Sequence, residues 1–104
     1  MTKASDALFD EAGGIWVFKP RGEVDISNAD EMRERLKTAF EERRADIRVD
    51  MGELTYIDST GLGVIIGTHD MLKNNGYRIF ITNPKDNVKK LLKITNLYRV
   101  LVEE

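Results

Sequence analysis

Apolar and polar positions alternate along this chain with two different periods. Short apolar runs bounded by Gly, Pro or charged residues are typical of strands, and apolar residues recurring every three or four positions are typical of amphipathic helices. The predicted elements are, in order, strands at 7–9 and 15–18, a helix from Ser27 to about Arg44, a strand at 47–51, a connector at 54–58, a helix from Ser59 to about Asn75, a strand at 77–82, a third helix after Pro84 and a short last strand at 99–102.

Local signals mark where several of these elements begin and end. Gly13 and Gly14 stand between two strand-like runs and predict a β-hairpin. Asn28 with Glu31 makes a capping box at the start of the first helix, because a side chain at each position can satisfy a free backbone N–H. Gly76 predicts a left-handed residue that stops the second helix.

This order of elements predicts one α/β domain covering residues 1–104. After the opening hairpin, strands alternate with helices, and such crossovers are right-handed and place consecutive strands in parallel. We therefore expect a mixed, mostly parallel sheet of about five strands, with the N-terminal hairpin as its antiparallel part, packed against helices. A chain of 104 residues is long enough for a real core but too short for a dinucleotide-binding domain plus a substrate domain.

Three polar segments follow predicted strands and are expected to meet. The carboxyl ends of parallel strands share one edge of a sheet, so residues 23–27, 58–61 and 83–86 should converge there. A site built from them would be acidic and polar, with Asp25, Asp58, Ser59 and Thr60 near its centre. The alternative is that these loops are polar only because they are open to water.

The six residues from Asp58 to Gly63 carry the most specific chemistry. Ser59 lies where the apolar run beginning at Ile57 turns helical, and a helix start exposes unpaired N–H groups and the positive end of the macrodipole. A phosphoryl group on Ser59 would be favoured there. Ser, Thr and Asp are also the preferred helix caps, so the hexapeptide fits an ordinary cap equally well.

Two motifs joined by the first predicted helix carry a family resemblance. Gly22-Glu23-Val24-Asp25 follows a strand, and Leu54-Thr55-Tyr56-Ile57-Asp58-Ser59-Thr60-Gly61-Leu62-Gly63 follows the helix. With this element order, nearly the whole chain resembles the STAS-domain anti-sigma factor antagonists of bacteria. The resemblance implies that Ser59 is the phosphoacceptor of an ATP-dependent serine kinase that is itself an anti-sigma factor. The family often has Ser where this chain has Thr60, which leaves Thr60 as a secondary candidate.

The resemblance also implies how such a protein works. The unmodified form binds the anti-sigma factor and frees the sigma factor, the phosphorylated form cannot, and a protein phosphatase resets Ser59. The alternative is a STAS module in another partner-switching or stress-signalling pathway, whose target is not an anti-sigma factor. In either case the predicted partner-binding residues are Glu23, Asp25, Ser27, Asp58, Ser59, Thr60, Gly61, Leu62 and Gly63.

Composition narrows the possible partners. Sixteen Lys and Arg against eighteen Asp and Glu give a formal charge of −2, and no stretch gathers the basic residues into a nucleic-acid stripe. The absence of cysteine excludes disulfides and thiolate zinc sites and fits a reducing cytosol. Residues 1–10 have no signal-peptide core, and the apolar run 62–67 is too short to span a membrane. We expect a cytoplasmic protein that binds neither nucleic acid nor membrane.

Other chemistries fit the residues poorly. His69, the single histidine, lies ten residues after Ser59, about 15 Å along one helix, so the two cannot form a catalytic pair. His69 is interpreted as a surface or half-buried helix residue. Gly61, Gly63 and Gly67 lack the Lys of a P-loop, and we expect these small residues to let the helix lie close to the sheet and a partner approach its first turn. We expect no cofactor, no metal and no enzymatic activity; the Asp25 and Asp58 pair could equally repel phosphate or do acid and base work.

Overall fold

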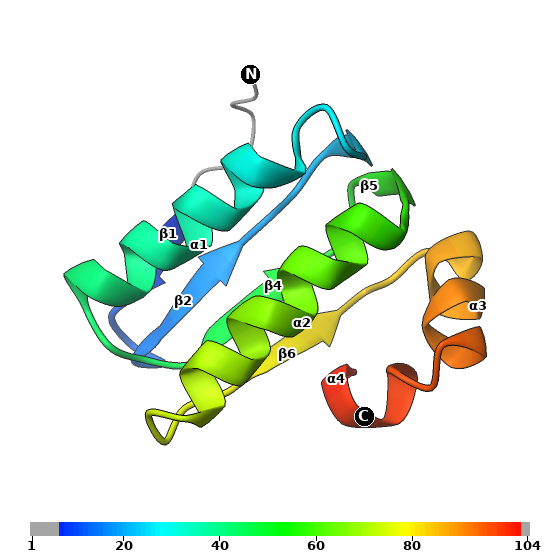
Figure 1. The fold of residues 1–104 in the computed structure, drawn as a ribbon. Helices are drawn as coiled ribbons and strands as arrows, with labels where there is room; N and C mark the ends of the chain where they lie inside the picture. The colour runs from blue at the N-terminus through cyan, green and yellow to red at the C-terminus, as the bar shows by residue number, and fades with distance from the viewer. Residues whose placement is uncertain (1–6, 103–104) are drawn as a thin grey trace.

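The computed structural model describes residues 7–102 as a sheet with helices against one face (Figure 1). The sheet has four strands in the order β1 (Ala7–Asp10), β2 (Ile15–Phe18), β4 (Ile47–Asp50) and β6 (Ile79–Thr82). The first two strands are antiparallel and the remaining pairs are parallel. The predicted hairpin and the predicted, mostly parallel sheet are therefore confirmed.

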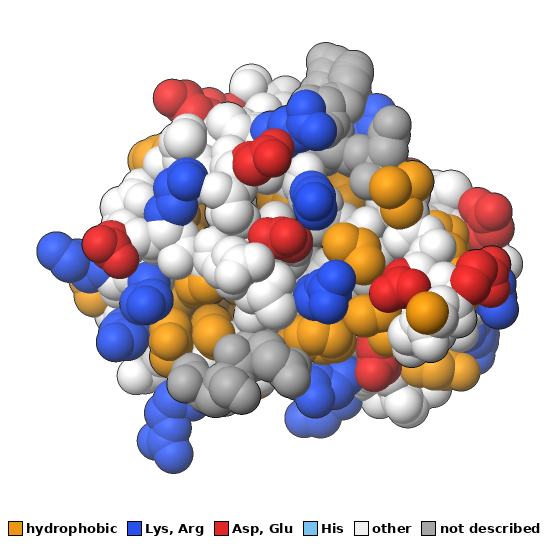
Figure 2. All heavy atoms as spheres, turned by 180° about the vertical axis from the view of Figure 1, so that it is seen from behind, with side chains coloured by type: hydrophobic (Ala, Val, Ile, Leu, Met, Phe, Trp, Pro, Cys, Tyr) orange, Lys and Arg blue, Asp and Glu red, His pale blue; other side chains and the backbone are white. Residues whose placement is uncertain are grey.

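The alternation of side chains along these strands places the core. Helices α1 (Ala29–Glu42) and α2 (Ser59–Lys73) lie over one face of the sheet (Figure 1). On that face the strand residues are fully buried: Phe18, Ile47, Val49, Ile79 and Ile81. The opposite face carries a row of cross-strand partners, Leu8, Val17, Arg48 and Phe80. Seen from behind, that side of the molecule mixes apolar, basic and acidic side chains (Figure 2).

The predicted connector at 54–58 is wrong, because its residues form a strand. β5 (Leu54–Ile57) pairs in parallel with β3 (Gly22–Val24) to make a second sheet of two strands. The period of two was absent from the sequence because Leu54 and Ile57 are buried while the two residues between them are exposed. The register shifts between Gly22 and Glu23, and Gly22 has φ +69°, a left-handed conformation that suits glycine.

The predicted last strand at 99–102 is also wrong. After α3 (Asp86–Ile94) the chain reverses at Asn96, which has φ +63°, and then forms the short helix α4 (Tyr98–Leu101). The apolar run is explained by Leu101, which is buried, and by Val102, which forms an isolated parallel bridge to Ile81. A short apolar run satisfies a turn of helix as well as a strand, so the sequence pattern could not separate the two.

Candidate functional site

The β3–β5 pair brings two of the three predicted segments together. Val24 and Ile57 are register partners at the ends of these strands, and the backbone N–H of Asp58 donates to the carbonyl of Val24 at 3.1 Å. The loop that begins at Asp25 and the first turn of α2 therefore start side by side. This confirms the expected convergence of residues 23–27 with residues 58–61.

The third segment, residues 83–86, borders this site from another side. The Asn83 side chain donates to the Asp50 carboxylate at 3.2 Å, at the end of β4. One residue beyond the segment, Asn87 donates to the carbonyl of Thr55 at 2.8 Å. These bonds tie the start of α3 to the strands that lead to the site, and they do not involve Ser59 or Asp25.

Asp58 is the N-cap of α2. Its backbone is extended, and its Oδ1 accepts a hydrogen bond from the N–H of Gly61 at 3.0 Å. Asp58 is half-buried, whereas Ser59, the first residue of the helix, and Thr60 are exposed. The cap thus belongs to the aspartate, and the hydroxyl of Ser59 is presented at the helix start, where free N–H groups favour a negative charge.

Gly61 fixes how closely α2 approaches the two-stranded sheet. A Cβ on Gly61 would lie 2.7 Å from Cγ1 of Ile57 and 2.8 Å from Cγ1 of Val24, closer than side chains tolerate. The expectation that small residues bring the helix onto the sheet is therefore confirmed at this position. It is wrong for Gly63 and Gly67, where an added Cβ would meet no heavy atom within 4 Å.

The loop after β3 is held by short side-chain bonds. Oδ1 of Asp25 accepts from the hydroxyl of Ser27 at 2.6 Å and from its N–H at 2.9 Å. The hydroxyl first, and then the backbone N–H, lower the pKa of the Asp25 carboxyl below its ordinary value, so the group is a carboxylate at neutral pH. The structure places this fixed negative charge on the loop that adjoins Asp58.

Asn28 differs from its predicted role in a capping box. It precedes α1 but makes no cap through its side chain. Instead it accepts from the N–H of Asp25 and donates to the carbonyl of Glu23, both at 2.9 Å. The loop competes successfully for this side chain because an amide can bond two backbone groups at once. Glu31 meets Arg35 at 3.6 Å rather than completing a box.

The predicted partner-binding residues divide into an exposed set and a buried set. The exposed residues are Glu23, Ser27, Ser59, Thr60 and Gly63, with Asp25 and Asp58 half-buried. Gly61 and Leu62 are buried, and Leu62 is part of the core. These two residues can support the site from below, but a partner would not touch the side chain of Leu62 without a change in the fold.

Sequence reasoning missed two exposed apolar residues beside the acidic ones. Ile26 is 79% exposed in the loop between Asp25 and Ser27, and Tyr56 is 47% exposed on β5, with Glu23 as its register partner. An isoleucine between two polar loop residues was the available signal. Tyrosine is enriched where proteins bind each other, which makes Tyr56 a candidate contact residue of this surface.

His69 is half-buried on α2, and its Nδ1 lies 3.4 Å from the N–H of Ile79, which donates to it. This agrees with its interpretation as an ordinary helix residue. Among residues 7–102, no cluster of three or more His, Asp or Glu side chains is arranged to hold a metal ion. In the same part of the chain, no helix has the length and apolar character needed to cross a membrane.

Comparison with known proteins agrees with this geometry. The sequence-family model of the STAS domain matches residues 7–103 of this chain. The anti-sigma-B factor antagonist of Bacillus subtilis is 36% identical over 80 residues, which are 77% of this chain and 72% of that protein. An anti-sigma-B factor antagonist of Staphylococcus aureus is 34% identical over 79 residues, covering 76% of this chain and 73% of that protein.

Solved structures share the fold. A putative anti-sigma factor antagonist from Thermotoga maritima superposes with a TM-score of 0.85 at 20% identity, covering 98% of this chain and 88% of that one. The anti-sigma factor antagonist SpoIIAA in its unphosphorylated form gives a TM-score of 0.80 at 21% identity, covering 97% and 89%. The chain therefore belongs to the STAS domain family and, within it, to the anti-sigma factor antagonists.

Proposed function

We propose that this chain is an antagonist switched by phosphorylation of Ser59. The unmodified form binds an anti-sigma factor that is also a serine kinase, and this binding releases the sigma factor. The single observation that carries the proposal is the exposed hydroxyl of Ser59 at the first residue of α2, directly after the capping Asp58 and beside the loop of Asp25. The sequence identity of 34–36% with anti-sigma-B factor antagonists supports the proposal.

A phosphate on Ser59 would act on the surface. It adds nearly two negative charges at a helix N-terminus, where the dipole and the free N–H groups favour them. A partner that had fitted a neutral hydroxyl would then have to accept a bulky dianion beside the loop that carries the Asp25 carboxylate. Binding is therefore lost while the fold is kept.

In this proposal the chain supplies no catalytic group. The kinase provides ATP and magnesium, and a protein phosphatase removes the phosphate. Asp25 contacts the kinase, and Asp58 holds the first turn of α2 so that Ser59 is presented to it. We place the switch in the cytoplasm, where sigma factors and ATP are found. The surface of this chain that binds the anti-sigma factor is also the surface that the anti-sigma factor, acting as a kinase, phosphorylates.

The assignment of Ser59 is tested by phosphorylation of matched variants. Ser59→Ala, Thr60→Ala and Ser27→Ala each remove one exposed hydroxyl of the predicted site. With the anti-sigma kinase and ATP, we expect Ser59→Ala to take up no phosphate and still bind, because it loses little surface, while Thr60→Ala and Ser27→Ala still take up one phosphate, on Ser59. Stoichiometric phosphate on Ser59→Ala, found by mass spectrometry, would show that the assignment is wrong.

A further inference from the structure

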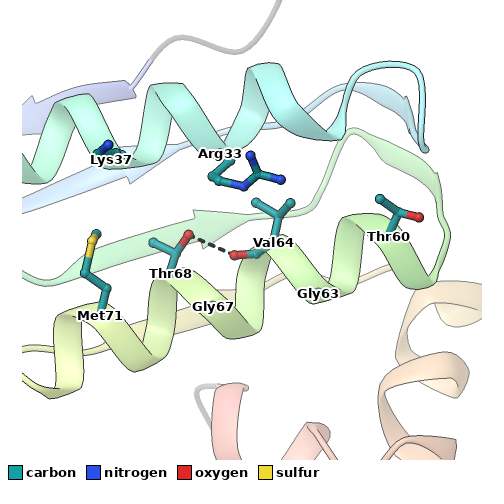
Figure 3. A pocket seen from close by; sticks show the side chains of 8 residues that line it. All are labelled: Arg33, Lys37, Thr60, Gly63, Val64, Gly67, Thr68 and Met71. Atoms are coloured by element: carbon teal, nitrogen blue, oxygen red, sulfur yellow. Dashed lines mark hydrogen bonds between the residues drawn. The ribbon is translucent and has the colours of Figure 1, made fainter.

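A groove runs between α1 and α2, beginning next to the proposed phosphorylation site (Figure 3). Its volume is about 330 Å³, and Thr60 lines the end nearest Ser59 while Met71 lines the end farther along α2. The residues that α2 contributes recur every three or four positions, so they form one continuous stripe of the helix surface. The groove is thus continuous with the first turn that presents Ser59.

The groove is open because two of its lining residues are glycines. Gly63 and Gly67 have open space where a Cβ would stand. A glycine inside a helix costs roughly 0.5–1 kcal/mol relative to alanine. At Gly61 that cost is explained by the contact with Val24 and Ile57. At Gly63 and Gly67 no heavy atom of the described part of the chain lies within 4 Å of where a Cβ would stand, so this space is open to water and can take a partner's side chain.

The opposite wall of the groove is cationic. Arg33 and Lys37, four residues apart on α1, line it, and no acidic side chain does among the residues that the structure describes there. The Arg33 side chain lies between α1 and α2 (Figure 3), and its guanidinium meets the carboxylate of Asp30, which is itself exposed, at 2.5 Å. The hydroxyl of Thr68, on the groove floor, donates to the carbonyl of Val64 within its own helix. The groove therefore offers an apolar floor and a basic wall, in which Lys37 stands beside an Arg33 charge that is shared with Asp30.

We propose that this groove receives an acidic segment of the anti-sigma factor: a small apolar side chain over Gly63 and Gly67, with a neighbouring carboxylate against Arg33 and Lys37. This inference rests on the proposed function and names the part of the partner that function requires. A volume of about 330 Å³ lies at the lower end of the roughly 300–1,000 Å³ of ligand pockets, so the groove holds one or two side chains. Ser59 and the groove would then be covered by one continuous interface.

A substitution can fill the groove without disturbing the packing of the core. Gly67→Leu puts a side chain into the open space, and Asp70→Leu adds the same side chain at an exposed position of α2 that does not line the groove. The probe is the anti-sigma serine kinase from the same genome, purified and titrated by calorimetry. We expect Gly67→Leu to bind the kinase at least about tenfold more weakly than the chain without substitutions, with an unchanged or higher melting temperature. Asp70→Leu should bind within about twofold of the affinity of the chain without substitutions.

Charge reversal tests the cationic wall separately. Lys37→Glu should weaken binding about tenfold, and this effect should shrink at high salt. The control is Arg44→Glu, which makes the same change of charge on an exposed residue just beyond α1 and away from the groove and should bind normally. Occupancy can also be observed directly by NMR. The methyl signal of Met71 should move on complex formation, while those of the buried Met32 and Met51 should stay in place.

The possible outcomes separate the two proposals. If the unmodified chain and Gly67→Leu bind the kinase equally and the Met71 signal does not move, the groove proposal is overturned while the proposed function stands. If the unmodified chain forms no complex with the kinase, the proposed function fails, and the groove assignment fails with it. Weaker binding by Gly67→Leu and Lys37→Glu, with normal binding by both controls, supports the groove.

Discussion

The four-stranded sheet and the β3–β5 pair are held together differently. In the larger sheet the inward side chains, such as Phe18 and Ile47, are fully buried beneath two helices. In the smaller sheet only the ends are buried, through Val24 and Leu54, while Tyr56 is exposed. The first region is stabilised by apolar burial, and the second is positioned by a few specific contacts. Stability and recognition should therefore respond to changes in different places.

The largest expected effect is in the large sheet. Phe18→Ala removes a fully buried ring and should lower the free energy of unfolding by about 3–5 kcal/mol. Tyr56→Ala, on the small sheet, should lower it by about 1 kcal/mol or less, because the side chain is half-exposed. Urea unfolding measures both. Equal losses would erase the distinction between the two regions.

The second effect compares two glycines on the same helix. Gly61→Ala forces a methyl group against Ile57 and Val24 and should destabilise the fold by about 1–3 kcal/mol. Gly63→Ala enters open space and should stabilise the helix by roughly 0.5–1 kcal/mol. Thermal melts of the two variants should shift in opposite directions. A shift in the same direction would contradict the close approach of α2 at Gly61.

The smallest effect on stability concerns the acids of the site. Asp58→Ala removes the cap on Gly61 and should cost about 1 kcal/mol, and Asp58→Asn less, because Asn also caps well. If Asp58 presents Ser59 to the kinase, both variants should be phosphorylated more slowly. Asp25→Asn should slow phosphorylation or weaken binding without unfolding the domain. Normal kinetics in all three, measured beside their melting temperatures, would leave these acids only structural roles.

Much of the fold could be predicted from the sequence where one face of each element is buried. The period of three and four in α1 and the alternation in β4 follow from burial against a single core, and both were predicted. The β3–β5 pair was not, because a register shift at Gly22 and two adjacent exposed residues in β5 remove the alternation. The last apolar run became α4 because Asn96 turns the chain before it.

The candidate site divides in the same way. The convergence of the loops of Asp25 and Asp58 followed from the geometry of parallel strands, and the structure confirms it. The exposure of Ile26 and the groove beside Gly63 and Gly67 depend on how helices and loops pack, which a sequence pattern does not specify. The roles of Ser59 and its neighbours stay predictions, which phosphorylation and binding experiments with the kinase can test.

The most direct test of the account is a paired measurement on the unmodified chain and the chain phosphorylated on Ser59. Melting temperature reports the fold, and affinity for the anti-sigma kinase reports the surface. We predict nearly equal melting temperatures and a loss of about 3 kcal/mol in binding, roughly a hundredfold in affinity. A large fall in melting temperature, or equal affinity of both forms, would contradict a switch that changes the surface and leaves the fold intact.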